Sequence, residues 1–523
     1  MSRSLTSVRL FQTLDAILLA ALMLLVAARR LNIPYPTLLA GAGLGVAALP
    51  LAPNIAVDPS LALALFIAPA LLHAAYHTSP RALLRYWFPL LSLAVFAVMV
   101  TTGAVTLAGM AVGGLPLASA LALGAIVAPP DAAASEAVVS EVGIPRRGLL
   151  ILQGESLLND ATALLLFGLA LTLSAAGVGE SESPWMLAAE APGGILFGLA
   201  VSWGYLRIIP LFSGTLGSSL VDFAVTFAVW LVAERLHLSP VLAVVSFGMI
   251  ISQYRPINQS ARDRVQTSAV WAAAILVLNV VAFMLMGLQS REVLGRLAPQ
   301  ERWPMIGFSL LILATVLVVR VAWILLIRWL EGFVTRRWSP SWLPEPPPWK
   351  AALVISWSGM RGLLTLATAF ALPAALPGRD QIVLAAFTVV IGTLVIQGLT
   401  LGPLIRWLRI GEDAQLGEKI ATARKQLIEA GLTTLGTRDD AAARALRTRY
   451  GAAGHVAAHA DDPQAASDFD RLHLEVIARQ RTMLHDMRRQ SIVADDVYRR
   501  LQEELDWSEI DARSFADNKL QAT

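Results

Sequence analysis

The sequence contains no cysteine and few charged residues, and both shortages limit what the protein can do. Without cysteine the chain has no disulfides, no thiolate metal site and no thiol nucleophile. Charged residues make up only 15% of its 523 residues, whereas 56% are hydrophobic, which is typical of a polytopic membrane protein. The formal net charge of +3 is too small to indicate a nucleic-acid partner. We therefore expect a protein surrounded by membrane lipid.

Common enzyme motifs are also missing. The sequence has no His-Glu-x-x-His metalloprotease pattern and no Gly-x-Ser-x-Gly nucleophile elbow. Its C-terminal part lacks a Gly-rich phosphate loop, which argues against nucleotide sensing. We therefore expect no enzymatic activity and no cofactor. The first apolar run ends at Arg29-Arg30 without a small-residue cleavage pattern, so we interpret it as a retained span.

The dominant feature is a series of hydrophobic segments, and we expect about thirteen transmembrane helices. Their approximate positions are residues 9–28, 33–50, 57–77, 84–110, 115–140, 147–174, 185–210, 215–236, 238–253, 265–289, 303–330, 349–375 and 379–408. Charged residues become frequent from about residue 411, which predicts a transmembrane domain at 1–410 and a helical tail at 411–523. A cytoplasmic tail would place every second loop on the cytoplasmic side as well. These loops contain more arginine and lysine than the loops on the other side.

One of these segments, residues 149–174, has a polar stretch at its centre. Glu155 and Asn159 share one stripe of the expected helix, and Ser156 and Asp160 share the next. A carboxylate at the centre of a membrane helix costs about 2.5–3.5 kcal/mol or more, so this face must turn towards protein or water. The pattern favours an ion site, and a purely structural hydrogen-bond cluster is the alternative.

Two segments are interrupted near their middle. Pro129 and Pro130 remove two amide donors directly before Asp131, and residues 356–362 combine two glycines with Arg361. Irregular backbone at this depth is tolerated only where it is buried in protein or lines a cavity. Interruptions at matching positions of two halves indicate a transporter binding site, and they predict two six-helix repeats separated by one linking helix.

Few charges are embedded in the membrane segments, so their pairing can be predicted. We count three acids, Asp131, Glu155 and Asp160, and two bases, Arg320 and Arg361. An unpaired arginine at mid-span would be very costly, so Arg320 should have an acidic partner. We favour Glu155 in a structural ion pair, which leaves Asp160 free to bind an ion. Arg361 is expected to neutralise the dipoles of the broken-helix ends.

The octapeptide GESLLNDA at residues 154–161 resembles the signature of the monovalent cation:proton antiporters of the NhaP and NHE type. Further matching motifs follow in the expected order: Ile33-Pro34, Ala128-Pro129-Pro130-Asp131, residues 239–244, Asn279 to Leu288, Arg320, and residues 359–362. The resemblance implies an all-α, NhaA/NhaP-like fold with two inverted six-helix repeats. It also makes residues 1–410 a cation/proton exchanger domain.

The resemblance further implies a homodimer in the cell (inner) membrane that exchanges Na⁺ or Li⁺ for H⁺. Asp160 would hold cation and proton in turn, while Asp131, Ser156 and the backbone of the broken fifth helix would complete the Na⁺ site. Asn159 stands where electroneutral relatives carry asparagine, which implies one proton per cation. Small-residue runs such as residues 41–45 show where helices could approach closely.

The chain departs from the family pattern at two positions, and these leave alternatives open. Pro130 stands where many relatives have threonine, and His73 stands where many have an acidic residue. His73 could bind water or respond to pH, or it could be a plain hydrogen-bonding residue. Exchange of K⁺ for H⁺ is therefore an alternative. A cation channel gated by the tail, and an intramembrane enzyme using Asp131 and Asp160, are less favoured.

Overall fold

The structure is a computed structural model of the chain. Apart from a few single positions, it describes residues 19–47, 61–131, 146–175, 184–212, 217–258, 261–288, 302–338, 346–408, 426–448, 463–490 and 495–512. Parts of several expected segments lie outside the described residues, and the longest of these parts are residues 9–18 and 132–140. The sequence also predicts breaks in the tail at residues 451–454 and 461–463, and of these positions only Pro463 lies within the described residues.

The described residues are helical, with no strand among them, and this confirms the all-α class. The chain divides into two compact units, residues 1–411 with 522–523, and residues 412–521. Each unit is described by itself below.

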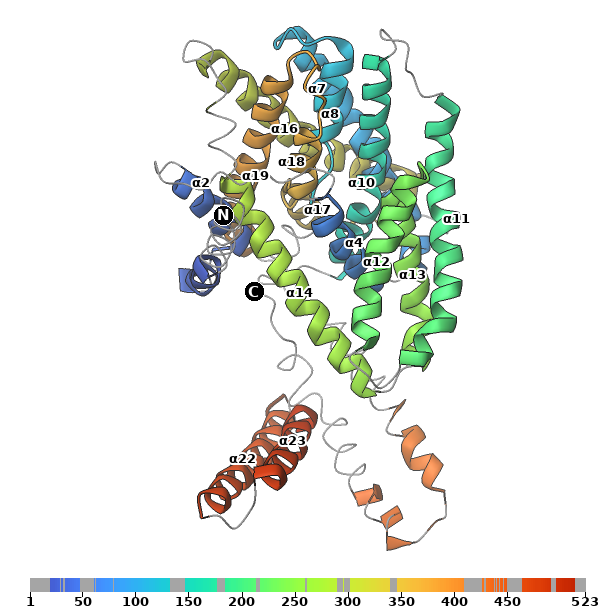
Figure 1. The fold of residues 1–523 in the computed structure, drawn as a ribbon, viewed down its shortest axis with the longest axis vertical. Coiled ribbons are helices and arrows are strands. Elements are labelled where there is room, and N and C mark those ends of the chain that lie inside the picture. Colours follow the sequence, from blue (N-terminus) through green and yellow to red (C-terminus); the bar gives the residue numbers. More distant parts are fainter. Residues whose placement is uncertain are drawn as a thin grey trace, which may run out of the picture. The chain divides into compact units, whose positions relative to one another are not determined.

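The first unit is a bundle of apolar helices (Figure 1). It contains the helix Leu19–Ala28, α2 (Tyr35–Ala47), the π-helix η1 (Leu63–Ile67), α4 (Ala68–His77), α5 (Pro80–Arg85), α6 (Trp87–Leu91), the π-helix η2 (Ser92–Ala97), α7 (Val98–Ala111), α8 (Leu117–Val127), α10 (Arg146–Ala175), α11 (Pro184–Ile208), the 3₁₀-helix η3 (Ile209–Phe212), α12 (Gly217–Arg235), α13 (Pro240–Asn258), α14 (Ala261–Leu288), α16 (Arg302–Trp338), α17 (Trp349–Trp357), α18 (Leu363–Phe370) and α19 (Arg379–Leu408). Every expected segment overlaps at least one of these helices. Within the described ranges, seven helices are long and apolar enough to cross a membrane, and shorter apolar helices accompany them.

The helices of this unit are apolar on both their inner and outer faces, as contact with lipid requires. On α16, for example, Ile312 and Val316 are fully buried, whereas Val318 and Trp329 are exposed. In water such exposed side chains would be unfavourable, whereas in lipid they match their surroundings. Apolar residues on all faces of these helices therefore indicate surroundings of membrane lipid. A surface helix of a water-soluble protein would have only one apolar stripe.

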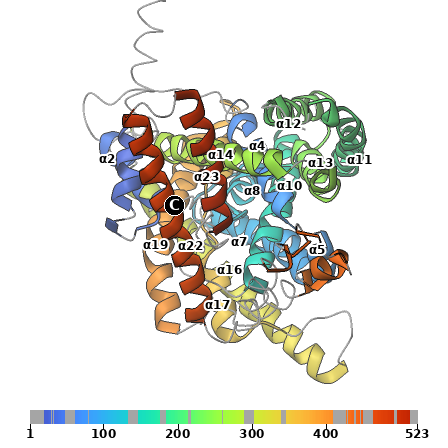
Figure 2. The same cartoon turned by 90° about the horizontal axis from the view of Figure 1, so that it is seen from below.

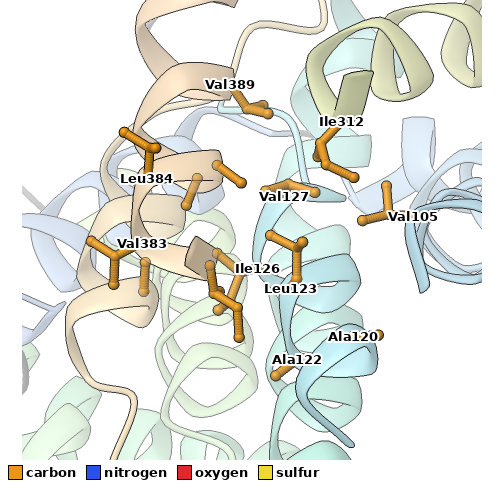
Figure 3. Close-up of a cluster of buried hydrophobic side chains, with 14 of the residues drawn as sticks. Val105, Ala120, Ala122, Leu123, Ile126, Val127, Ile312, Val383, Leu384 and Val389 are labelled. Atoms are coloured by element: carbon orange, nitrogen blue, oxygen red, sulfur yellow. The ribbon is translucent and has the colours of Figure 1, made fainter. Parts of the chain in front are cut away.

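The C-terminal end of α8 lies in a hydrophobic cluster that holds it from two sides (Figure 3). On one side it meets α19 through Val383, Leu384 and Val389, and on the other side it meets Val105 of α7 and Ile312 of α16. Because these side chains are buried and closely packed, the end of α8 has a defined position. This is the end that carries the first predicted break.

The small-residue run at residues 41–45 makes one close helix crossing within the chain. A methyl group added at Gly43 would lie 2.6 Å from the Met284 carbonyl oxygen of α14, and Gly287 is packed equally tightly against α2. Gly41 and Gly45 meet nothing within 4 Å. The glycine at the centre of the run therefore allows α2 and α14 to pack backbone against backbone.

The second unit contains a helical hairpin made of α22 (Pro463–Arg489) and α23 (Asp495–Ala512), which lie side by side (Figure 2). Ile477 and Leu484, seven residues apart on one face of α22, are buried. Arg481 forms ion pairs with Asp506 and Glu509 of α23. The expectation of helices in this part of the chain is therefore met.

Candidate ion-binding site

The two predicted breaks lie against each other. The first follows α8 at Ala128 to Asp131, and the second separates α17 from α18 at residues 358–362. The backbone N–H of Asp131 donates a hydrogen bond to the Met360 carbonyl oxygen at 2.7 Å. Because Pro129 and Pro130 cannot donate, the helix ends here, and the next amide finds its acceptor in the other break. The two interruptions therefore form one structural element.

Arg361 is buried at this junction and holds the C-terminal end of α8. Its Nε donates to the Val127 carbonyl oxygen at 3.1 Å, and its Nη2 donates to the Ala128 carbonyl oxygen at 3.2 Å. Its Nη1 donates to the carbonyl oxygen of Gly359. The last carbonyls of a helix carry a partial negative charge and lack helical partners. The guanidinium supplies both the charge and the donors that this end needs.

Asp131 has the complementary position at the N-terminal end of α18. Its Oδ2 accepts a hydrogen bond from the N–H of Leu363, the first residue of that helix, at 3.2 Å. A side chain at Gly362 would overlap the Asp131 carboxylate, so only glycine allows this approach. The negative carboxylate faces the positive end of α18, just as Arg361 faces the negative end of α8. The junction is thus charge-compensated at both helix ends.

The polar stretch of α10 joins the first break through Asn159. The fully buried Asn159 donates from Nδ2 to the Pro130 carbonyl oxygen at 3.0 Å. Its Oδ1 has no hydrogen-bond partner among the described residues. Ser156, one turn earlier on α10, is also buried. A buried acceptor oxygen without a donor is costly, and a bound cation would satisfy it.

Asp160 follows on the same helix and is partly accessible. Its carboxyl group and that of Asp131 are close enough for their charges to interact. Among the residues that the structure describes, no basic side chain forms an ion pair with Asp160. It is therefore a carboxyl group beside the junction that can take up a positive ion.

Glu155 and Arg320 form the buried ion pair that the charge accounting predicts. Arg320 Nη1 lies 2.6 Å from Glu155 Oε1, and Nη2 lies 3.0 Å from Oε2, so the contact is bidentate. The side chains are 1% and 5% exposed for Glu155 and Arg320, respectively. A side chain at Gly359 would overlap the Arg320 guanidinium, so the ion pair is in direct contact with the second break.

Among the described residues, His73 forms no hydrogen bond or ion pair with the groups of this junction. It lies on α4, and its ring contacts that of His77, one turn further along, with the ring centroids 4.4 Å apart. The contact is between two side chains of one helix, so it indicates local packing. A role for His73 at the ion site stays a prediction.

The charge accounting is incomplete: besides Asp263 and Glu331, which are buried on α14 and α16, it omits Asp222. This residue is 1% exposed on α12, one of the apolar helices long enough to span a membrane. Tyr205 of α11 donates to its Oδ1, and Trp271 Nε1 of α14 lies 3.4 Å from its Oδ2. The signal in the sequence was the polar spacing of Ser218, Asp222 and Thr226, four residues apart on one helix face.

Two interrupted segments that meet inside a bundle of membrane helices, with the carboxyl group of Asp160 beside them, are the architecture of a secondary transporter. The comparison with protein families agrees with this class. The chain belongs to the family "Sodium/hydrogen exchanger, transmembrane", whose family model matches residues 17–407.

Several bacterial relatives are similar over most of the chain. An uncharacterised Na⁺/H⁺ exchanger of Mycobacterium tuberculosis is 28% identical over 514 residues, which covers 93% of both chains. A sodium, potassium, lithium and rubidium/H⁺ antiporter of Bacillus pumilus is 31% identical over 427 residues and covers 77% of this chain and 62% of the relative. The fold is similar to that of the sodium proton antiporter MjNhaP1 from Methanocaldococcus jannaschii, with a TM-score of 0.61, 19% identity, and coverage of 77% of this chain and 98% of that chain.

Proposed function

We propose that the protein exchanges Na⁺ or Li⁺ for H⁺ across the membrane, and that Asp160 carries the exchange. The observation that supports this most directly is the position of Asp160. It is a partly accessible residue whose carboxyl group lies close to that of Asp131 in the first break, and it has no basic partner among the described residues. The other acid on the same helix, Glu155, is already paired with Arg320.

The groups around Asp160 provide the ligands that a hard monovalent cation prefers. Asp131 contributes a second carboxylate, Ser156 a hydroxyl group, and Asn159 the amide oxygen that lacks a partner. Oxygen ligands of this kind suit Na⁺ and Li⁺, and the chain has no cysteine to offer a softer ligand. In this proposal, Na⁺ binds to Asp160, Asp131 and Ser156, with Asn159 completing the shell.

Coupling follows from the charge of Asp160. An ionised carboxylate without a counter-ion is costly to move through an apolar barrier. A bound cation compensates its charge, and a bound proton removes it. The transporter can therefore change between its inward-facing and outward-facing states when Asp160 holds either ion, and rarely when it holds neither. Because both cannot occupy the same carboxylate, each transition carries a cation one way or a proton the other way.

The proposed stoichiometry is one proton per cation. It rests on Asn159, which places a neutral amide beside Asp160 and donates to the first break. A single carboxylate binds either one cation or one proton, so one positive charge moves in each direction. The rate of exchange should therefore not depend on the membrane potential.

Exchange of K⁺ is a second candidate function. The printed name of the Bacillus pumilus relative includes potassium and rubidium besides sodium and lithium. The departure at His73, where many relatives carry an acidic residue, is a second reason to test K⁺. The experiment below separates these ions.

We further propose a homodimer in the cell membrane with a cytoplasmic C-terminus. The excess of arginine and lysine in one set of loops supports this orientation. Residues 1–410 would then form the exchanger domain, and residues 411–523 a cytoplasmic helical domain.

The test is proton flux in vesicles that contain the purified protein and carry an imposed pH gradient. Na⁺, Li⁺ and K⁺ are added in turn, for the wild type and for Asp160→Asn. We expect Na⁺ or Li⁺ to dissipate the gradient in the wild type alone. Asp222→Asn, which changes another buried membrane acid outside the junction, is the matched control and should still exchange. A folded Asp160→Asn protein that exchanges at the wild-type rate would refute the proposal.

A further inference from the structure

One backbone amide of the second break is held by a side chain of another helix. The N–H of Arg361 donates a hydrogen bond to Oγ1 of Thr393 on α19, at 3.0 Å. The same hydroxyl group donates to the Val390 carbonyl oxygen at 3.1 Å, so it accepts from the break while donating to its own helix. Thr393 is 0% exposed, so water does not compete for this contact. α19 therefore anchors the broken segment at a residue that no helical hydrogen bond holds.

The anchored residue stands between the two points at which Asp131 is held. The N–H of Asp131 donates to Met360, one residue before Arg361, and its carboxylate accepts from Leu363, two residues after it. The Arg361 side chain meanwhile holds the last carbonyl oxygens of α8. A shift of the Arg361 backbone would therefore move the Asp131 carboxylate and the end of α8 together.

The same helix also positions the first break by apolar packing. Val383, Leu384 and Val389 of α19 pack against the end of α8 (Figure 3). Thr393 lies about one helical turn beyond Val389. One rigid helix thus contacts both breaks, the first through hydrophobic side chains and the second through a single hydroxyl group.

We infer that Thr393 is a positioning residue for cation binding. Its hydroxyl group fixes the backbone of Arg361 and thereby the separation between the carboxyl groups of Asp131 and Asp160. It acts through Arg361 and is not a ligand of the ion. This inference rests on the proposed function, because it assigns Thr393 to the ion site described there.

The test uses the full chain in vesicles and compares variants of two threonines. Thr393→Val keeps the side-chain volume but removes both hydrogen-bonding functions, and Thr393→Ser keeps the hydroxyl group. Thr226→Val is the matched control, because Thr226 is also 0% exposed. Among the described residues, its hydroxyl group bonds only within α12, to the Asp222 carbonyl oxygen at 2.6 Å. The apparent KM and the maximal rate are measured with whichever of Na⁺, Li⁺ and K⁺ the wild type exchanges.

We expect Thr393→Val to raise the apparent KM for the cation about tenfold, which is the scale of leaving one buried donor unpaired. The maximal rate should change by less than about twofold, because the loss affects the binding of the ion. Thr393→Ser and Thr226→Val should keep the wild-type KM. Thr393→Ala introduces a smaller side chain than Thr393→Val and should show the same rise in apparent KM. It replaces the valine variant in the test if that variant does not fold.

An unchanged KM in folded Thr393→Val or Thr393→Ala protein overturns the inference. So does a failure of both variants to fold while Thr226→Val folds, because Thr393 would then act on folding alone. In either case normal exchange by the wild type leaves the proposed function standing. Absence of exchange by the wild type instead refutes the proposed function, and the inference with it.

Discussion

Removing the Arg320 guanidinium leaves the Glu155 carboxylate buried without its partner, and we expect this to be the most destabilising single charge change in the first unit. Both side chains are at least 95% buried, and the contact is bidentate. Breaking a buried ion pair from one side costs about 3–5 kcal/mol, because the remaining charge stays uncompensated. Arg320→Ala also empties the space behind Gly359, which the guanidinium fills.

This free-energy loss can be converted into a melting temperature. With an unfolding entropy of about 2 cal/mol/K per residue and about 400 residues unfolding together, about 4 kcal/mol corresponds to about 5 °C. The assay is thermal unfolding of the purified protein in detergent. Arg336→Ala, which removes an exposed arginine from the same helix α16, is the control and should melt within about 1 °C of the wild type.

A double variant separates the charge effect from lost packing. Arg320→Met combined with Glu155→Leu removes both charges together and keeps side chains of similar length. Replacing a buried ion pair by apolar residues is often neutral or stabilising, so the double variant should recover most of the loss. The reasoning is refuted if Arg320→Ala melts like Arg336→Ala, or if the double variant is as unstable as the single one.

Two further predictions concern other contacts of the same unit. Gly362→Ala should abolish exchange, because the added methyl group overlaps the Asp131 carboxylate, whereas Gly204→Ala, where nothing lies within 4 Å, should exchange normally; transport rates of the two variants decide this. Asp222→Leu should lower the melting temperature, because the Tyr205 hydroxyl group loses its buried acceptor at a cost of about 1–3 kcal/mol, while its apparent KM for the cation should stay at the wild-type value. A wild-type melting temperature for Asp222→Leu would contradict the second prediction.

The sequence was sufficient to predict the helical membrane class and the position of both breaks. Apolar segments of about 20 residues are local signals, and so are Pro129, Pro130 and the glycines around Arg361. The pairing of Glu155 with Arg320 was also accessible, because a membrane interior admits few charges and each must find a partner among them.

The contacts that complete the junction could not be predicted in this way. Asp131 and Leu363 are 232 positions apart, and their contact depends on how α8 and α18 pack. The hydrogen bond between Arg361 and Thr393 also depends on how helices pack. A threonine in an apolar helix can bond to its own backbone, so the sequence does not indicate a partner on another segment. Asp222 was not predicted, although its spacing from Ser218 and Thr226 places all three residues on one helix face.

The central claim is that a cation and a proton compete for Asp160. The most direct test measures the apparent KM for the transported cation in vesicles over a range of pH, with equal pH on both sides of the membrane. Competition for one carboxylate predicts that KM rises in proportion to the proton concentration at acidic pH, while the maximal rate stays constant. A KM that does not change with pH, in a protein that exchanges the cation for protons, would contradict a shared site at Asp160.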